Sequence, residues 1–199
     1  MAEPRHTTIE IAGWVERLQG GEGAARDHLL DVASERLLLL ARKMFRGDFP
    51  RLARWAETDD LAQNARLRLW KALETARPES VLAFFRLAAV QVRRELIDLA
   101  RHHFGPEGPA AHHTTRTGPF EDQLSSEDDP VRLAAWTEFH EQVQELPDDL
   151  CAVFDMLWYQ GLTQIETAEL LGVTERTIQR RWVAARQELS RRLREDPSA

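Results

Sequence analysis

Hydrophobic positions along the chain recur at the three- and four-residue spacing of amphipathic helices, and no run alternates apolar and polar residues as a half-buried strand would. Glycine, proline and N-capping residues separate these periodic segments. In the N-terminal half they predict helices over about Ile9–Leu18, Ala24–Phe45, Thr58–Ala76 and Ser80–His103, with Thr58 and Ser80 as N-caps. The pattern therefore predicts an all-α fold.

Residues 104–130 interrupt this pattern. Glycine, proline and serine dominate the stretch, and acidic residues gather at its C-terminal end. A structureless stretch of this length is uncommon inside a compact domain and typical of a linker. We therefore expect two small helical domains, residues 1–103 and 131–199, joined by a flexible acidic linker over 104–130.

The C-terminal domain carries the pattern of a helix-turn-helix. Thr163 and Glu166 have the spacing of a capping box, Gly172 marks a tight turn, and Thr174 is placed to cap a second helix. The apolar residues of that second helix share one face and are Ile178, Trp182, Ala185, Leu189 and Leu193. In such a motif the second helix enters the major groove of DNA.

Charge supports this interpretation. The chain has a net charge of −7, but residues 174–194 hold seven arginines and two acids, a local charge of +5. The candidates for reading bases are Glu175, Arg176, Thr177, Gln179 and Arg180. Arginine can pair bidentately with guanine and glutamine with adenine, and Arg181 and Arg186 suit phosphates. A helical hairpin with a solvated arginine face is the plainer alternative.

The predicted helix over 58–76 has two distinct faces. Its core face is formed by Leu61, Ala65, Leu69 and Leu73. A second face combines polar side chains with one exposed leucine at its centre, and consists of Asp60, Gln63, Asn64, Leu67 and Lys71. This mixture is typical of a wet protein interface, although a solvated helix face has a similar composition.

Two segments resemble conserved regions of one family. The run from Leu146-Pro147 to Ile178 is similar to the fourth conserved region of sigma factors, and response regulators carry a similar motif. Asp60-Leu61 followed by Gln63 resembles the second conserved region, with Asn64 in place of the usual acid. Because both segments occur in the family's order, the chain is identified as similar to extracytoplasmic-function (ECF) sigma factors of the sigma-70 family. The sequence from Phe84-Phe85 to Ala100-Arg101 resembles that of a planctomycete-type subgroup of the family.

This resemblance implies a transcription initiation factor that brings core RNA polymerase to a promoter and promotes DNA melting. The polymerase contact, on the clamp helices of the largest subunit, would be made by Asp60, Leu61, Gln63, Asn64, Leu67 and Lys71. The helix-turn-helix would read the −35 element. The −10 element would be bound through its backbone and its single strand by Arg77, Arg93, Arg94, Arg101 and His102. Arg77 would lie in the loop that captures a flipped base. An anti-sigma factor is a further candidate partner.

Several other classes of protein are disfavoured. No apolar run approaches the length of a membrane span, and the N-terminus lacks the pattern of a secretory signal. The single cysteine, Cys151, excludes an internal disulfide, fits a reducing cytoplasm and is expected to be an ordinary buried thiol. No signature of an enzyme, cofactor or metal site stands out. Two alternatives stay open, a one-component regulator with an N-terminal sensor or dimerisation domain, and a helical adaptor that binds no DNA.

Overall fold

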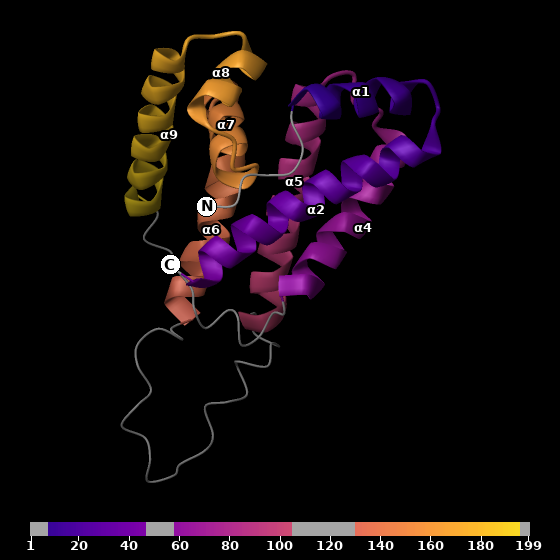
Figure 1. The fold of residues 1–199 in the computed structure, drawn as a ribbon. Helices are drawn as coiled ribbons and strands as arrows, with labels where there is room; N and C mark the ends of the chain where they lie inside the picture. The colour runs from indigo at the N-terminus through magenta and orange to yellow at the C-terminus, as the bar shows by residue number, and fades with distance from the viewer. Residues whose placement is uncertain (1–7, 47–57, 105–129, 196–199) are drawn as a thin grey trace.

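The computed structural model describes residues 8–46, 58–104 and 130–195, and these residues form helices joined by short turns, without a strand (Figure 1). The all-α prediction is confirmed. The N-terminal helices are α1 (Thr8–Gln19), α2 (Gly23–Arg46), α4 (Thr58–Thr75) and α5 (Val81–Phe104). The C-terminal helices are α6 (Pro130–Gln144), α7 (Asp148–Phe154), the π-helical turn η3 (Asp155–Tyr159), α8 (Gln164–Leu171) and α9 (Glu175–Glu195).

The helix boundaries follow from local sequence signals. The hydroxyl of Ser80 accepts a hydrogen bond from the backbone N–H of Ala83 at 3.1 Å, which is the expected N-cap of α5. Pro147 occupies the N-cap position of α7. Thr58 is the first residue of α4, but its side chain lies outside the described residues, as does nearly all of the predicted linker.

The N-terminal helices α1, α2, α4 and α5 enclose one hydrophobic core. Burial of its apolar side chains is the main stabilising term. The core includes Ile11, Leu29, Leu69, Leu73, Phe84 and Phe85, which are nearly inaccessible to solvent. Since α4 directs Leu69 and Leu73 inward, its opposite side faces solvent.

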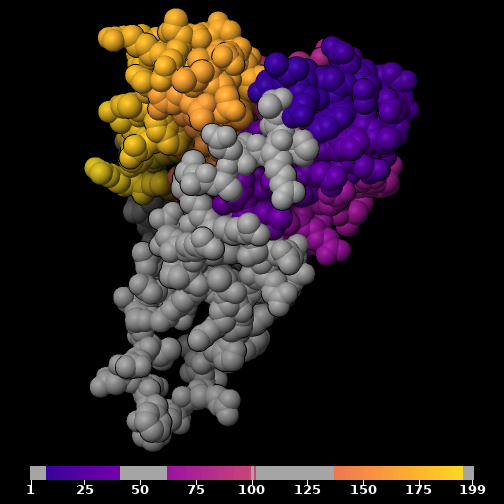
Figure 2. Space-filling view, viewed as in Figure 1, coloured from indigo at the N-terminus to yellow at the C-terminus, as the bar shows by residue number. Residues whose placement is uncertain are grey.

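The C-terminal helices pack directly against α5, so the two groups of helices form one continuous body (Figures 1 and 2). A shared hydrophobic cluster joins them. From α5 it takes Val92 and Leu96, and from the C-terminal helices it takes Val143, Phe154 and Tyr159. The pattern of hydrophobic positions did not predict this contact. The domain boundaries themselves stay a prediction.

Among the described residues, no helix has both the length and the apolar character needed to cross a membrane.

Candidate nucleic-acid interface

Helices α8 and α9 are the two helices of the segment that the sequence predicts as a helix-turn-helix, and a short turn joins them. The Thr163 hydroxyl accepts a hydrogen bond from the Glu166 N–H at 3.2 Å, and the Glu166 carboxylate accepts one from the Thr163 N–H at 2.7 Å, so the capping box is confirmed. Gly172 ends α8 with φ of +63°, a left-handed conformation that favours glycine. The Thr174 hydroxyl then accepts from the N–H of Thr177 at 3.3 Å and begins α9.

The two sides of α9 differ as the sequence predicted. Ile178, Ala185 and Leu189 are buried, and Trp182 is half-buried against the core. Four of the candidate base-reading residues at the start of the helix are exposed, namely Glu175, Arg176, Gln179 and Arg180. Thr177 is half-buried, and its hydroxyl bonds to that of Thr174 at 2.9 Å. The first turns of α9 therefore offer arginine and glutamine to a ligand.

The arginines of α9 fall into two electrostatic groups. Arg176, Arg180 and Arg186 are exposed and form no ion pair with any residue that the structure describes. Arg181 instead pairs with Asp149 of α7, with 3.1 Å between Nε and Oδ2. The arginines of the first group can bind phosphates directly, whereas Arg181 would first have to break its ion pair with Asp149.

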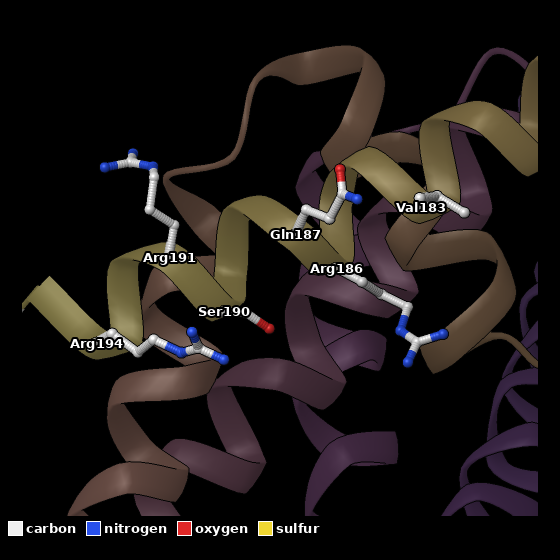
Figure 3. A pocket seen from close by; sticks show the side chains of 6 residues that line it. All are labelled: Val183, Arg186, Gln187, Ser190, Arg191 and Arg194. Atoms are coloured by element: carbon white, nitrogen blue, oxygen red, sulfur yellow. The ribbon is translucent and has the colours of Figure 1, made fainter.

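Further along α9, Glu188 neutralises two neighbouring arginines. Arg191 and Arg192 each donate to its carboxylate at 2.7 Å, and these hydrogen bonds lower the pKa of Glu188 to about 2. Arg192 also donates to the backbone carbonyl of Glu145 at 2.9 Å. Figure 3 shows Arg191 directed away from Arg186 and Arg194, which border a shallow hollow on the exposed side of the helix.

The predicted contact face of α4 is exposed. Gln63, Asn64 and Lys71 point to solvent, and Leu67 at the centre of the face is 53% exposed. The side chains of Asp60 and Leu61 lie outside the described residues, although both residues belong to α4. An exposed leucine within a polar face is the feature that the sequence predicted for an interface.

A groove of about 1210 Å³ runs between α4 and α5 and begins at this face. Leu67 and Lys71 line it from α4, and Arg94 lines it from α5. Three further basic side chains line the groove. They are Arg68, Arg77 in the loop between the helices, and Arg86, which sequence reasoning missed. The structure therefore joins the predicted polymerase contact to two of the predicted −10 residues, Arg77 and Arg94, in one basic groove with apolar side chains.

Arg68 is held in place across this groove. Its guanidinium donates to Glu95 at 2.7 Å and to Asp98 at 2.5 Å. Asp98 is thus bonded to α4, and Arg101 is bonded to Glu141 of α6 at 2.5 Å. Asp98 and Arg101 therefore pair with residues of other helices instead of with each other along α5.

Arg93 lies on the other side of α5, away from the groove. Its side chain is 3% exposed, forms an ion pair with Asp155 of η3, and lies over the ring of Tyr159 at 5.0 Å. Nucleic acid cannot reach Arg93 in this arrangement. The side chain of His102 lies outside the described residues. The predicted −10 residues therefore divide between the groove and the contact with the C-terminal helices.

A buried polar cluster surrounds this ion pair. The Tyr159 hydroxyl and His140 Nδ1 are 2.6 Å apart, and Arg36 donates to the backbone carbonyl of Gln160 at 2.7 Å. Burial raises the pKa of Asp155 to about 6, although Arg93 opposes the rise. Burial, assisted by the charge of Arg93, lowers the pKa of His140 to about 3. His140 is therefore neutral at physiological pH.

Cys151 differs from its prediction. It is half-buried instead of fully buried, with its sulfur 3.9 Å from a carboxylate oxygen of Asp155. Burial is the main cause that raises the pKa of its thiol. A thiol with a raised pKa is a poor nucleophile, because the thiolate is the reactive form.

Comparison with known proteins identifies the class. Residues 8–195 match the family model described as ECF sigma factor, and the chain belongs to that family. It is thus a sigma factor, a DNA-binding protein of transcription initiation that works with core RNA polymerase and promoter DNA. A search of curated proteins found no match.

Proposed function

We propose that this sigma factor docks on core polymerase through the exposed face of α4 and presents two DNA-binding surfaces to a promoter. The observation that carries the proposal is the continuity between Leu67 and the basic groove. A partner that covers Leu67 would leave the adjoining groove open and could guide a DNA strand along that groove. The clamp helices of the polymerase largest subunit are the proposed partner, in contact with Gln63, Asn64, Leu67 and Lys71, and with Asp60 and Leu61 of the same helix.

The −35 element is read by the start of α9. Arg176, Gln179 and Arg180 are exposed there and carry the groups that discriminate guanine and adenine in the major groove. Glu175 and Thr177 flank them. Arg186 lies further along the helix and binds phosphate, and Arg181 joins it once its pair with Asp149 separates.

The −10 element meets the groove as a single strand. Basic side chains attract the phosphates, while the apolar side chains Leu87 and Val90 offer contacts to unstacked bases. Binding that favours the single strand over the duplex promotes melting by mass action. Arg77 and Arg94 act from within the groove, and Arg101 and His102 extend the surface along α5, whereas Arg93 is buried against η3 and makes no contact with the strand.

The finer classification is part of the same proposal. The sequence from Phe84 to Arg101 supports the planctomycete-type subgroup, and work with polymerase supports a cytoplasmic location. An anti-sigma factor is a candidate regulator. The alternative of a one-component regulator is not favoured, because the family match extends across both groups of helices and not the helix-turn-helix alone.

Substitution of Leu67 tests the docking site. Leu67→Glu places a charge at the centre of the contact, and we expect it to abolish co-elution with core polymerase in gel filtration while the helical circular-dichroism signal is unchanged. Ile165→Glu is the matched control, because Ile165 is an equally exposed apolar residue, 58% exposed, on α8. Normal co-elution of the Leu67→Glu variant would move the contact elsewhere.

Promoter-dependent transcription tests the function itself. Purified core polymerase should produce a specific transcript only when the chain is added. DNA binding by the isolated chain without any effect on core polymerase would support a one-component regulator instead.

A further inference from the structure

Arg68 connects the two helices that form the walls of the basic groove, α4 and α5, which lie side by side (Figure 1). Its Nε donates to Glu95 at 2.7 Å, and its Nη2 donates to Asp98 at 2.5 Å. Among the residues that the structure describes, these are the side-chain hydrogen bonds that pass from α4 to α5. We term Arg68, Glu95 and Asp98 the clasp.

The clasp fixes the geometry of the groove more than it adds stability. Arg68 and Asp98 are partly exposed, and ion pairs at such positions contribute little because water screens them. The Glu95 side chain is only 7% exposed, so its carboxylate requires a hydrogen-bonding partner. A guanidinium that donates from two nitrogens to two carboxylates is held in one orientation, which an ammonium group cannot reproduce. The clasp therefore sets how α4 and α5 are spaced on the side of the groove.

Two cations of the groove lie next to the clasp, one on each wall. Lys71 is about one helical turn beyond Arg68 on α4, and Arg94 is about one turn before Asp98 on α5. Both side chains are exposed and line the groove, and neither forms an ion pair with a described residue. The separation of these two charges depends on the spacing of α4 and α5, which the clasp fixes.

We propose that Arg68 is a positioning residue for the single strand that the groove binds. By holding α5 through its two carboxylates, Arg68 sets the spacing at which Lys71 and Arg94 bind phosphates of one strand. It also neutralises carboxylates that would otherwise repel those phosphates. The inference rests on the proposed function, in which the groove takes the −10 element as a single strand.

Removal of one carboxylate separates position from charge, because the two predict opposite results. The probe is a short, fluorescently labelled single-stranded DNA, titrated by anisotropy into the holoenzyme, with core polymerase alone as the blank. Asp98→Ala removes a negative charge beside a groove that binds phosphates, so charge alone would tighten strand binding. If the clasp positions the cations, the same variant should instead bind the strand several-fold more weakly. Glu74→Ala is the control and should not weaken binding, because Glu74 pairs with Arg26 of α2 outside the groove.

Replacement of Arg68 by lysine keeps the charge but loses the guanidinium that reaches both carboxylates. For Arg68→Lys we expect an affinity about tenfold lower, the effect of one lost charged contact. The slope of log affinity against log salt should fall by about 0.7, the value for one phosphate of a single strand. A purely structural defect would lower the fraction of active protein and leave this slope unchanged.

Arg66→Lys is the matched control for Arg68→Lys. Arg66 lies on the same helix, is 38% exposed where Arg68 is 40% exposed, and pairs with Asp31 of α2 at 2.5 Å. The Arg66→Lys variant should keep the parent affinity and the parent salt slope. Circular dichroism and co-elution with core polymerase confirm that each variant folds and docks. Should Arg68→Lys fail to fold, Asp98→Ala still decides, since its substitution is at an exposed position.

A double-mutant cycle asks whether Arg68 acts through Arg94. In the Arg94→Ala background, Arg68→Lys should change the affinity by about twofold or less, because the cation that it positions is gone. A full tenfold loss in that background would overturn the positioning role. Tighter binding by Asp98→Ala, or equal effects of Arg68→Lys and Arg66→Lys, would overturn it as well.

The parent holoenzyme distinguishes this inference from the function on which it rests. If the parent binds the strand no better than core polymerase alone, the proposed function of the groove is contradicted and the positioning role falls with it. If the parent binds the strand and the clasp variants bind it equally well, only the positioning role is overturned.

Discussion

Acidification should destabilise the protein through His140, which is completely buried beside Tyr159. The pKa of His140 is about 3 in the folded chain and about 6.5 once unfolding exposes the ring. Below pH 6.5 the unfolded chain therefore binds a proton that the folded chain does not. The stabilising contribution is complete above pH 6.5 and is lost as the pH falls towards 3, by about 2 kcal/mol between pH 7.5 and pH 5.

The measurement compares His140→Gln with the parent chain in urea, at pH 7.5 and at pH 5, by tryptophan fluorescence. Trp158 contacts the His140 ring, with 5.5 Å between their centroids, and should report unfolding there. At pH 7.5 the variant loses the hydrogen bond to Tyr159 and should be less stable by about 1–3 kcal/mol. At pH 5 we expect this difference to shrink by about 2 kcal/mol, because glutamine does not titrate.

Asp155 acts in the opposite direction, since its pKa of about 6 lies above the ordinary value of 3.8. Its contribution to stability is present below pH 3.8 and is lost as the pH rises through 6. Both chains retain Asp155, so the comparison isolates His140. A stability difference between His140→Gln and the parent that is constant from pH 7.5 to pH 5 would refute the reasoning.

Two further predictions concern the predicted helix-turn-helix. Arg176→Ala should weaken binding to the −35 element by about 1–3 kcal/mol and relax selectivity at one base step, whereas Arg186→Ala should weaken binding to all sequences alike. Competition with single-base variants in a holoenzyme binding assay distinguishes the two effects, and a uniform loss from both variants would reject base reading by Arg176. Thr163→Ala removes the capping box and should lower the free energy of unfolding by about 1 kcal/mol, with Thr75→Ala, at the exposed C-terminal end of α4, as a control of little effect. Equal unfolding midpoints for the Thr163→Ala chain and the parent would contradict that estimate.

Features that depend on neighbouring residues could be predicted from the sequence. The capping box at Thr163, the turn at Gly172 and the exposed Leu67 each follow from helical periodicity or from side chains within a few positions. Local signals also gave the ends of the helices to within about a residue. The exposed face of α4 was predictable because the period assigns Leu69 and Leu73 to the core and leaves Leu67 outside.

Contacts between distant segments could not be predicted in this way. Arg93 and Asp155 are 62 positions apart, and each belongs to a helix in which a charged residue is normally solvated. Periodicity identifies the inward side of one helix but does not say that a second group of helices will cover its other side. The π-helical turn that carries Asp155 and Tyr159 also escaped prediction, because hydrogen bonds of the i to i+5 type leave no distinct mark in composition.

We expect the carboxylates beside the arginines of α9 to affect how the factor is distributed in a cell. A bacterial chromosome offers on the order of a million or more non-specific sites, and these retain a strongly basic protein in proportion to the counterions it displaces. Asp149 forms an ion pair with Arg181, and Glu188 forms ion pairs with Arg191 and Arg192. The chain as a whole is acidic. Few counterions would be released when the isolated chain meets random DNA. Most copies would then be free to diffuse and to compete for the limited supply of polymerase.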